Sequence, residues 1–367
     1  MLITNTQELR LYLPSHAFDS IDGLVGFIDN SEHDFLLQPL GQPLYDKLCD
    51  WYDQNKLAIS TVEDKDTPYY NRLLLMAQRC VAFDAMGRMV GAQGISMNNS
   101  GINMSVANDY PKADRESIND AKSTYQKEAH TALNRLLYTL EQWTALAAVP
   151  DGSAAVSDDS SQSSGAGGTP AELQEICTLW NSSRYFYLAG NMLIPSAVVL
   201  QEYLNIYDNR EKFIQMLPDF RFIQEEVLAP AIGEDFVDWI IPQVVSGKLN
   251  DDQPTVMSRL LRKLRKIDTC YLEGRTTVIK VDKQRKIDAH DEGVRLLGQF
   301  CEYCRQHQPD ILTALGDQAD AYRNSPLYIA PQPEPATNGQ CSMVNGQYSP
   351  SDFNNPDMAL HVTMPLL

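Results

Sequence analysis

The stretch FLLQPLG at residues 35–41 decides the fold of this chain, because a diverged copy of it, VLAPAIG, stands at residues 227–233. Both stretches hold a proline inside an apolar run and end in a glycine, and they lie 192 positions apart. Self-similarity is sought first, since a missed duplication leads to a wrong assignment of the whole fold. The pair predicts that one structural unit occurs twice.

The similarity extends to both sides of this pair, in the same order and with nearly the same spacing. The offset is 191 for the first of the following pairs and 187 for the other two, which predicts a loss of five residues from a loop of the second copy. The aligned pairs are Leu2-Ile3-Thr4-Asn5 with Leu193-Ile194-Pro195-Ser196, Arg72-Leu73-Leu74 with Arg259-Leu260-Leu261, and Gly87-Arg88 with Gly274-Arg275.

A chance likeness between two amphipathic helical stretches is the alternative, because leucine periodicity arises without common descent. The glycine, arginine and tyrosine matches lie outside what that periodicity requires. We therefore expect a mainly α fold of two tandem, diverged helical-bundle units, each with a small β-hairpin or strand insertion. The expected units span residues 1–147 and 171–325, with a flexible linker at 148–170 and an extended C-terminal arm at 326–367.

Local signals predict most of the helices. Asn5 or Thr6 suits the N-cap of a short first helix, and Pro43 suits the first turn of a later one. The other expected helical segments are 20–36, 69–89, 112–147, 196–207 and 285–307, all from apolar residues at intervals of three and four.

Two segments alternate apolar and polar residues, as β-strands do. Residues 95–104 place Asn98-Asn99-Ser100-Gly101 between two such runs, and asparagine and glycine tolerate the positive φ of a tight turn. This predicts a β-hairpin. In the second copy, residues 276–281 predict one strand without an evident partner.

Charge is distributed unevenly along the chain. The net charge is −18, which argues against a general nucleic-acid coat, because phosphate binding depends on lysine and arginine. Yet residues 259–286 hold ten basic and three acidic residues. On a helix, part of this basic island forms a patch for DNA or for an acidic surface of another subunit, and the alternative is an ordinary solvated face. The candidate binding residues are Arg259, Arg262, Lys263, Arg265 and Lys266.

Cys301, Cys304 and His307 stand at three-residue intervals, so they share neighbouring parts of one helical face and form a weak candidate metal site. A zinc site needs a fourth ligand, and only His290 is at hand. A core helix that contains two cysteines is the simpler interpretation. No catalytic motif, phosphate-binding glycine loop or cofactor site is expected, so we expect a protein that is not an enzyme and has no cofactor.

The chain shows no basic, apolar leader and no run of eighteen apolar residues, so neither secretion nor a membrane partner is expected. Seven scattered cysteines are typical of reduced thiols in a cytosol-like compartment. The expected location is the cytoplasm or a virus particle.

The opening LITNTQELRLYL at residues 2–13, followed by a helix that ends in Pro39-Leu40-Gly41, resembles the head–tail connector (adaptor) proteins of tailed phages. Residues 180–186 through 194–196 to 230–233 look like an uncharacterised family of prophages and mobile elements of gut anaerobes. The resemblance implies a helical adaptor that forms a homo-oligomeric ring between portal and tail proteins, with DNA at most a transient partner. It carries over no catalytic residue, and the doubled unit departs from single-unit connectors.

Overall fold

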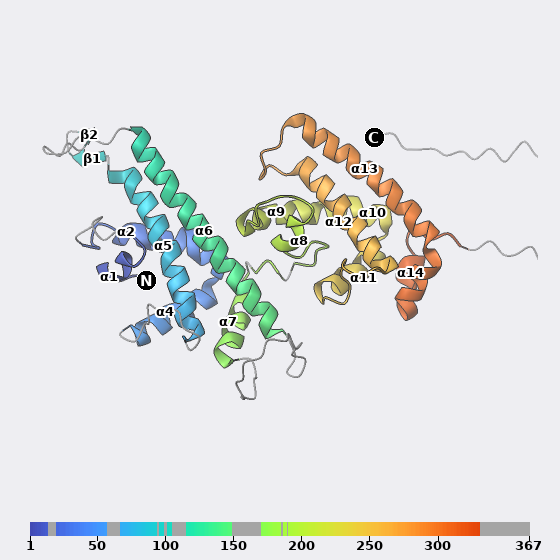
Figure 1. Cartoon of the computed structure of the whole chain (residues 1–367), viewed down its shortest axis with the longest axis horizontal. Helices are drawn as coiled ribbons and strands as arrows, with labels where there is room; N and C mark the ends of the chain where they lie inside the picture. Colours follow the sequence, from blue (N-terminus) through green and yellow to red (C-terminus); the bar gives the residue numbers. More distant parts are fainter. Residues whose placement is uncertain are drawn as a thin grey trace, which may run out of the picture. The chain divides into compact units, whose positions relative to one another are not determined.

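A computed structural model describes the chain, and it is mainly α-helical, as the periodicity predicts (Figure 1). Residues Met1–Tyr328 form one compact unit. The arm expected at 326–367 lies, beyond Ala330, outside the described residues. The described residues are 1–13, 20–56, 67–93, 95–98, 101–104, 115–148, 170–184, 186–188 and 190–330.

The elements before residue 189 are called the N-terminal half below, and those after it the C-terminal half. The N-terminal half holds α1 (Thr6–Arg10), α2 (Val25–Ser31), a π-helical turn η1 (Glu32–Leu36), α3 (Leu37–Leu40), α4 (Gln42–Asn55), α5 (Tyr69–Gln93), β1 (Ile95–Asn98), β2 (Gly101–Met104), α6 (Arg115–Ala147) and α7 (Ala171–Asn181). The C-terminal half holds α8 (Ala197–Gln201), α9 (Arg210–Ile223), a π-helical turn η2 (Gln224–Leu228), α10 (Ala229–Ile232), α11 (Glu234–Val245), α12 (Val256–Arg275), α13 (Lys283–Gln306), α14 (Gln308–Leu315), a 3-10 turn η3 (Gly316–Gln318) and α15 (Asp320–Arg323).

Several helices begin where a side chain accepts a hydrogen bond from a free backbone N–H group of the first turn. At α1, the Asn5 side chain accepts from the Glu8 backbone N–H at 2.9 Å, and the Glu8 carboxylate accepts from the Asn5 N–H at 3.4 Å. Ser196 caps α8 and Thr255 caps α12. The caps at Asn5 and Ser196 lie at predicted positions, because capping depends on a few neighbouring residues.

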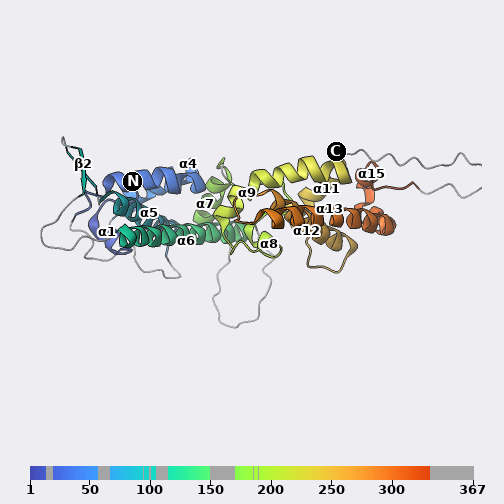
Figure 2. The same cartoon turned by 90° about the horizontal axis from the view of Figure 1, so that it is seen from above.

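Two long helix pairs form the body of the fold, α5 with α6 and α12 with α13 (Figures 1 and 2). Helix α5 buries residues on most of its sides, as its apolar composition predicts, and leaves Arg79 exposed. Strands β1 and β2 pair antiparallel where the hairpin is expected, with Ile95 opposite Met104.

The strand expected at 276–281 is wrong. This segment links α12 to α13 without strand structure. The Thr276 N–H continues the helix by donating to the Leu272 carbonyl, and the Thr276 hydroxyl then accepts from the Val278 N–H at 3.2 Å. These local bonds use the backbone groups that a strand would offer to a partner.

Helix α7 lies against α4, α5 and α6 of the N-terminal half. Its Trp180 indole N–H donates to the Pro39 carbonyl at 3.1 Å, and the backbone N–H of Tyr69 at the start of α5 donates to Glu172 at 2.9 Å. The segment from residue 171, which we expected to open the second unit, therefore completes the first half. The residues of the expected linker, apart from Ala148 and Pro170, lie outside the described ones.

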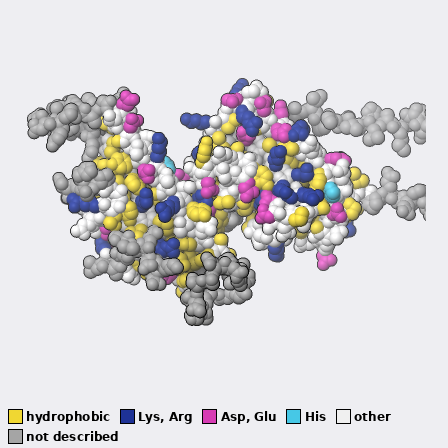
Figure 3. Space-filling view, viewed as in Figure 1, with side chains coloured by type: hydrophobic (Ala, Val, Ile, Leu, Met, Phe, Trp, Pro, Cys, Tyr) yellow, Lys and Arg dark blue, Asp and Glu magenta, His cyan; other side chains and the backbone are white. Residues whose placement is uncertain are grey.

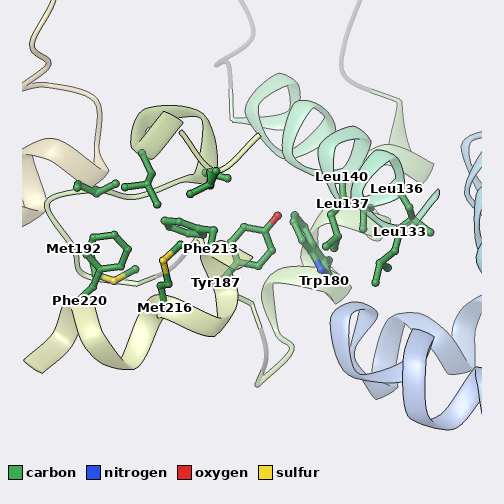
Figure 4. Close-up of a cluster of buried hydrophobic side chains, with 14 of the residues drawn as sticks. Leu133, Leu136, Leu137, Leu140, Trp180, Tyr187, Met192, Phe213, Met216 and Phe220 are labelled. Atoms are coloured by element: carbon green, nitrogen blue, oxygen red, sulfur yellow. The ribbon is translucent and has the colours of Figure 1, made fainter. Parts of the chain in front are cut away.

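Aromatic and leucine side chains join the two halves in one buried cluster (Figure 4). Tyr187 lies between the rings of Trp180 and Phe213, with ring centroids 5.8 Å and 6.1 Å apart, both edge to face. Leu137 and Leu140 of α6 close the same cluster. Burial of these large side chains opposes separation of the halves.

Candidate functional site

The basic residues of α12 divide into an exposed set and a buried one. Arg259, Arg262, Lys263 and Lys266 are exposed, whereas the apolar residues of the same helix are buried, namely Leu260, Leu261, Leu264 and Ile267. The exposed residues recur at intervals of three and four, which places them along one side of the helix. We call these four residues the basic face of α12. Lys and Arg side chains gather in this region of the surface (Figure 3).

None of these four cations forms a salt bridge with a carboxylate in the part of the chain that the structure describes. Arg262 donates to the Gln253 carbonyl at 3.4 Å, and the Lys263 ammonium lies 5.0 Å from the centre of the Tyr303 ring on α13. The basic face therefore presents positive charge beside an aromatic ring, which suits an anionic partner.

Arg265 was expected to belong to this patch, and that expectation is wrong. Its side chain is 5% exposed, and its guanidinium reaches Asp251 at 2.8 Å and the Leu193 carbonyl at 3.0 Å. Helices α9, α13 and α14 cover α12 on several sides. Arg265, which follows the buried Leu264, is therefore also buried. Arg265 therefore lies inside the fold, where it links Leu193 at the start of the C-terminal half to Asp251.

The candidate metal ligands do not assemble into a site. No group of three or more His, Cys, Asp and Glu side chains in the described ranges is placed to hold a metal ion. Cys304 is buried, and burial raises the pKa of its thiol, which disfavours the thiolate that would bind a metal. His307 instead lies 3.4 Å from Asp310. Cys301 is a half-buried position of α13, and Cys304 is a core position.

A buried polar cluster lies at the contact of α6 with α9, and no sequence pattern predicts it. The Arg210 guanidinium donates to Glu141 at 3.0 Å and lies 4.7 Å from the centre of the Tyr138 ring. The Tyr187 hydroxyl donates to the other oxygen of Glu141 at 2.5 Å, and the Arg210 backbone N–H donates to Asn134 at 2.8 Å. We call this set the junction cluster.

Burial raises the pKa of Glu141, although Arg210 and Tyr187 counteract this effect. Beside the cluster, His130 lies 2.7 Å from Glu211, and this hydrogen bond raises the pKa of the histidine. A charged residue at a helix start, such as Arg210, is normally solvated, so the sequence held no sign that this one is buried. Glu141, one position after Leu140 on α6, was equally inconspicuous.

Comparison with protein families gives one match, to a family of unknown function (DUF6712), over residues 36–145. The match runs from the end of η1 to near the end of α6 and therefore stays within the N-terminal half. No curated protein and no solved structure matches the chain. Among the described helices, none is long and apolar enough to cross a membrane.

Proposed function

We propose that this chain is a non-enzymatic structural protein, a head–tail connector-like adaptor of a phage-like particle, built from two diverged copies of one helical unit. It would assemble with further copies of itself and with portal or tail proteins. Its mainly helical fold and the joined cores of its two halves support a role in assembly.

One observation carries the proposal: polar contacts recur between residues at matching positions of the two halves. The Leu2 N–H donates to the buried Glu32 carboxylate at 2.7 Å, and the Leu193 N–H donates to the buried Gln224 amide oxygen at 3.4 Å. The Leu2 carbonyl accepts from the Gln78 amide at 2.7 Å, as the Leu193 carbonyl does from Arg265. These pairs are 191, 192 and 187 positions apart.

The turn after each π-helical segment supports the same proposal. Gly41 and Gly233 have φ of +80° and +100°, a region that glycine enters at little cost. A Cβ on Gly41 would collide with Ser183, and a Cβ on Gly233 would lie 2.7 Å from the Cβ of Ser325. Leucine periodicity explains neither the paired positive φ nor the paired serine contacts.

Light scattering on the purified protein, alone and with a candidate portal protein, tests the proposal. We expect a particle of several chains, or a complex with the portal protein. A strict monomer that joins neither itself nor the portal protein would contradict an assembly role.

A second candidate is a non-phage adaptor that binds an acidic partner through the basic face of α12. The cations of this face favour it, because they form no salt bridge with the described carboxylates. Charge reversal of Arg262, Lys263 and Lys266 to Glu should then abolish capture of a DNA duplex or an acidic protein and leave helicity intact. Reversal of the exposed Lys127 and Lys248, two residues instead of three, controls for a change of net charge elsewhere on the surface. Unchanged capture after the first set would exclude this function for the basic face.

A further inference from the structure

Helix α6 presents a second stripe to the C-terminal half, apart from the stripe it buries against α5. His130, Asn134 and Glu141 of this stripe contact Arg210 and Glu211 at the start of α9, through the hydrogen bonds described above. Tyr138 lies beside them under the Arg210 guanidinium. This stripe is therefore the surface of the N-terminal half that contacts the C-terminal half.

Helix α13 holds the corresponding stripe of the C-terminal half. Arg135-Leu136-Leu137 of α6 recurs as Arg295-Leu296-Leu297 of α13, 160 positions later, and the buried Ala129 and Leu140 correspond to the buried Ala289 and Phe300. At this offset, His130, Asn134, Tyr138 and Glu141 correspond to His290, Val294, Gly298 and Cys301.

The middle of the α13 stripe, at Val294 and Gly298, is exposed, and it is more apolar than its counterpart on α6. Val294 is 51% exposed, and Ile287, two turns before it, is 45% exposed. A Cβ on Gly298 would meet nothing within 4 Å. Valine and glycine here replace the asparagine and tyrosine of α6, so the matching surface should also be apolar rather than charged.

We propose that the exposed stripe of α13 binds the α2 region of a second copy of this chain, in a head-to-tail contact. In the duplicated unit α2 occupies the place of α9, since the π-helical turns that follow both helices lie 192 positions apart. The α2 region offers a small, apolar surface. Val25 is 40% exposed, and Cβ atoms on Gly23 and Gly26 would meet nothing within 4 Å. This inference rests on the duplication in the proposed function.

Such a contact joins two different surfaces, the α13 stripe of one chain and the α2 region of another. Each chain therefore still has a free surface that can bind a further chain. Contacts of this kind close into rings or continue into filaments, depending on the rotation between neighbours. The internal contact of α6 with α9 provides the precedent within one chain, and the contact of α13 with α2 would continue it between chains.

Two blocked variants test the contact. Val294→Glu blocks the α13 surface, and Val25→Glu blocks the α2 surface. Sedimentation and light scattering measure the association constant of each protein. The constant of either variant should be about tenfold or more below that of the wild type, because the substitution places a charge in an apolar contact. Val198→Glu, at a residue of α8 that is 43% exposed, is the matched control and should associate like the wild type.

Mixing the variants tests the head-to-tail arrangement. The intact α13 surface of Val25→Glu can receive the intact α2 surface of Val294→Glu, so the mixture should form a heterodimer and stop there. A mixture as monomeric as its components would overturn the proposal, and so would a Val294→Glu variant that assembles like the wild type. The latter result would leave the proposed function standing. A wild-type protein that stays monomeric alone and with a portal protein would remove both proposals.

Discussion

The guanidinium of Arg210 on α9 and the carboxylate of Glu141 on α6 meet at 3.0 Å, with only 1% and 8% of their side chains exposed. Removal of one member of a buried ion pair leaves the other charge without compensation. We therefore expect Glu141→Ala to lower the free energy of unfolding by about 3–5 kcal/mol. Urea denaturation followed by circular dichroism measures this loss.

The neighbouring ion pair of the junction is the control for that experiment. The His130 side chain is 54% exposed, and pairs at such positions contribute about 1 kcal/mol or less. His130→Ala should therefore have a small effect beside Glu141→Ala. If the two variants lose the same stability, the burial of Arg210 and Glu141 has no special role.

The pairing of His130 with Glu211 also predicts a pH dependence. The hydrogen bond raises the pKa of His130 above its ordinary value of 6.5. The stabilising contribution is therefore fully present below pH 6.5, and it disappears as the pH rises through the pKa of the folded state. Thermal melts of wild type and His130→Gln should differ most at the acid end and converge at the alkaline end. A gap that widens with rising pH would show the opposite linkage.

Arg265 and Arg262, three positions apart on α12, should respond differently to truncation. Arg265→Ala leaves the buried Leu193 carbonyl without its donor and Asp251 without its counter-charge, and it should cost about 3 kcal/mol or more of unfolding free energy. Arg262→Ala removes an exposed side chain, and its effect should stay within about 0.5 kcal/mol. Differential scanning calorimetry of both variants measures the contrast. Equal melting temperatures would mean that Arg265 is not held as described.

Asp268 is a buried position where we expect a gain of stability. Neither of its carboxylate oxygens has a hydrogen-bond partner among the described residues, and burial raises its pKa well above 3.8. The ionisation of this group therefore costs no stability below about pH 3.8, and its cost grows as the pH rises from there to the raised pKa of the folded state. The proposed duplication aligns Asp268 with Val81, 187 positions earlier, which is a buried valine.

Asp268→Val should accordingly raise the melting temperature at neutral pH, with a gain of about 1–3 kcal/mol from removal of an unsatisfied polar group. Asp268→Asn removes the ionisation alone and should give a smaller gain. The advantage of both variants should shrink toward acid pH, where the wild-type carboxyl binds its proton. A lower melting temperature for Asp268→Val would indicate that the carboxyl contributes to stability.

The helices were predictable because their signals are local. Asn5 and Ser196 mark helix starts through bonds to residues three positions away, and alternating apolar and polar residues indicate the strand pair Ile95–Asn98 and Gly101–Met104. The strand expected at 276–281 failed because alternation alone supplies no partner strand. The Thr276 hydroxyl instead accepts a hydrogen bond from the Val278 backbone N–H in a local turn.

The candidate site was only partly predictable, because burial depends on how many neighbours cover a helix. Arg265 lies at the border of the apolar stripe of α12, where the sequence alone does not decide between burial and exposure. The packing of α9, α13 and α14 shows that it is buried. The pairing of Glu141 with Arg210 joins residues 69 positions apart, and no local pattern announces it. The position of α7 was missed for the same reason, since the polar composition of residues 149–169 favoured a boundary there.

The position of α7 determines which pieces of this protein can stand alone. A fragment that ends at Ala148 would lack Trp180, which fills the core between α3 and the leucines of α6, and would expose that apolar surface to water. The smallest autonomous N-terminal fragment must therefore continue to Ser183, which packs against Gly41. A protease that cuts between Ala148 and Pro170 would nick the protein without releasing a domain, and the two pieces would separate only on denaturation.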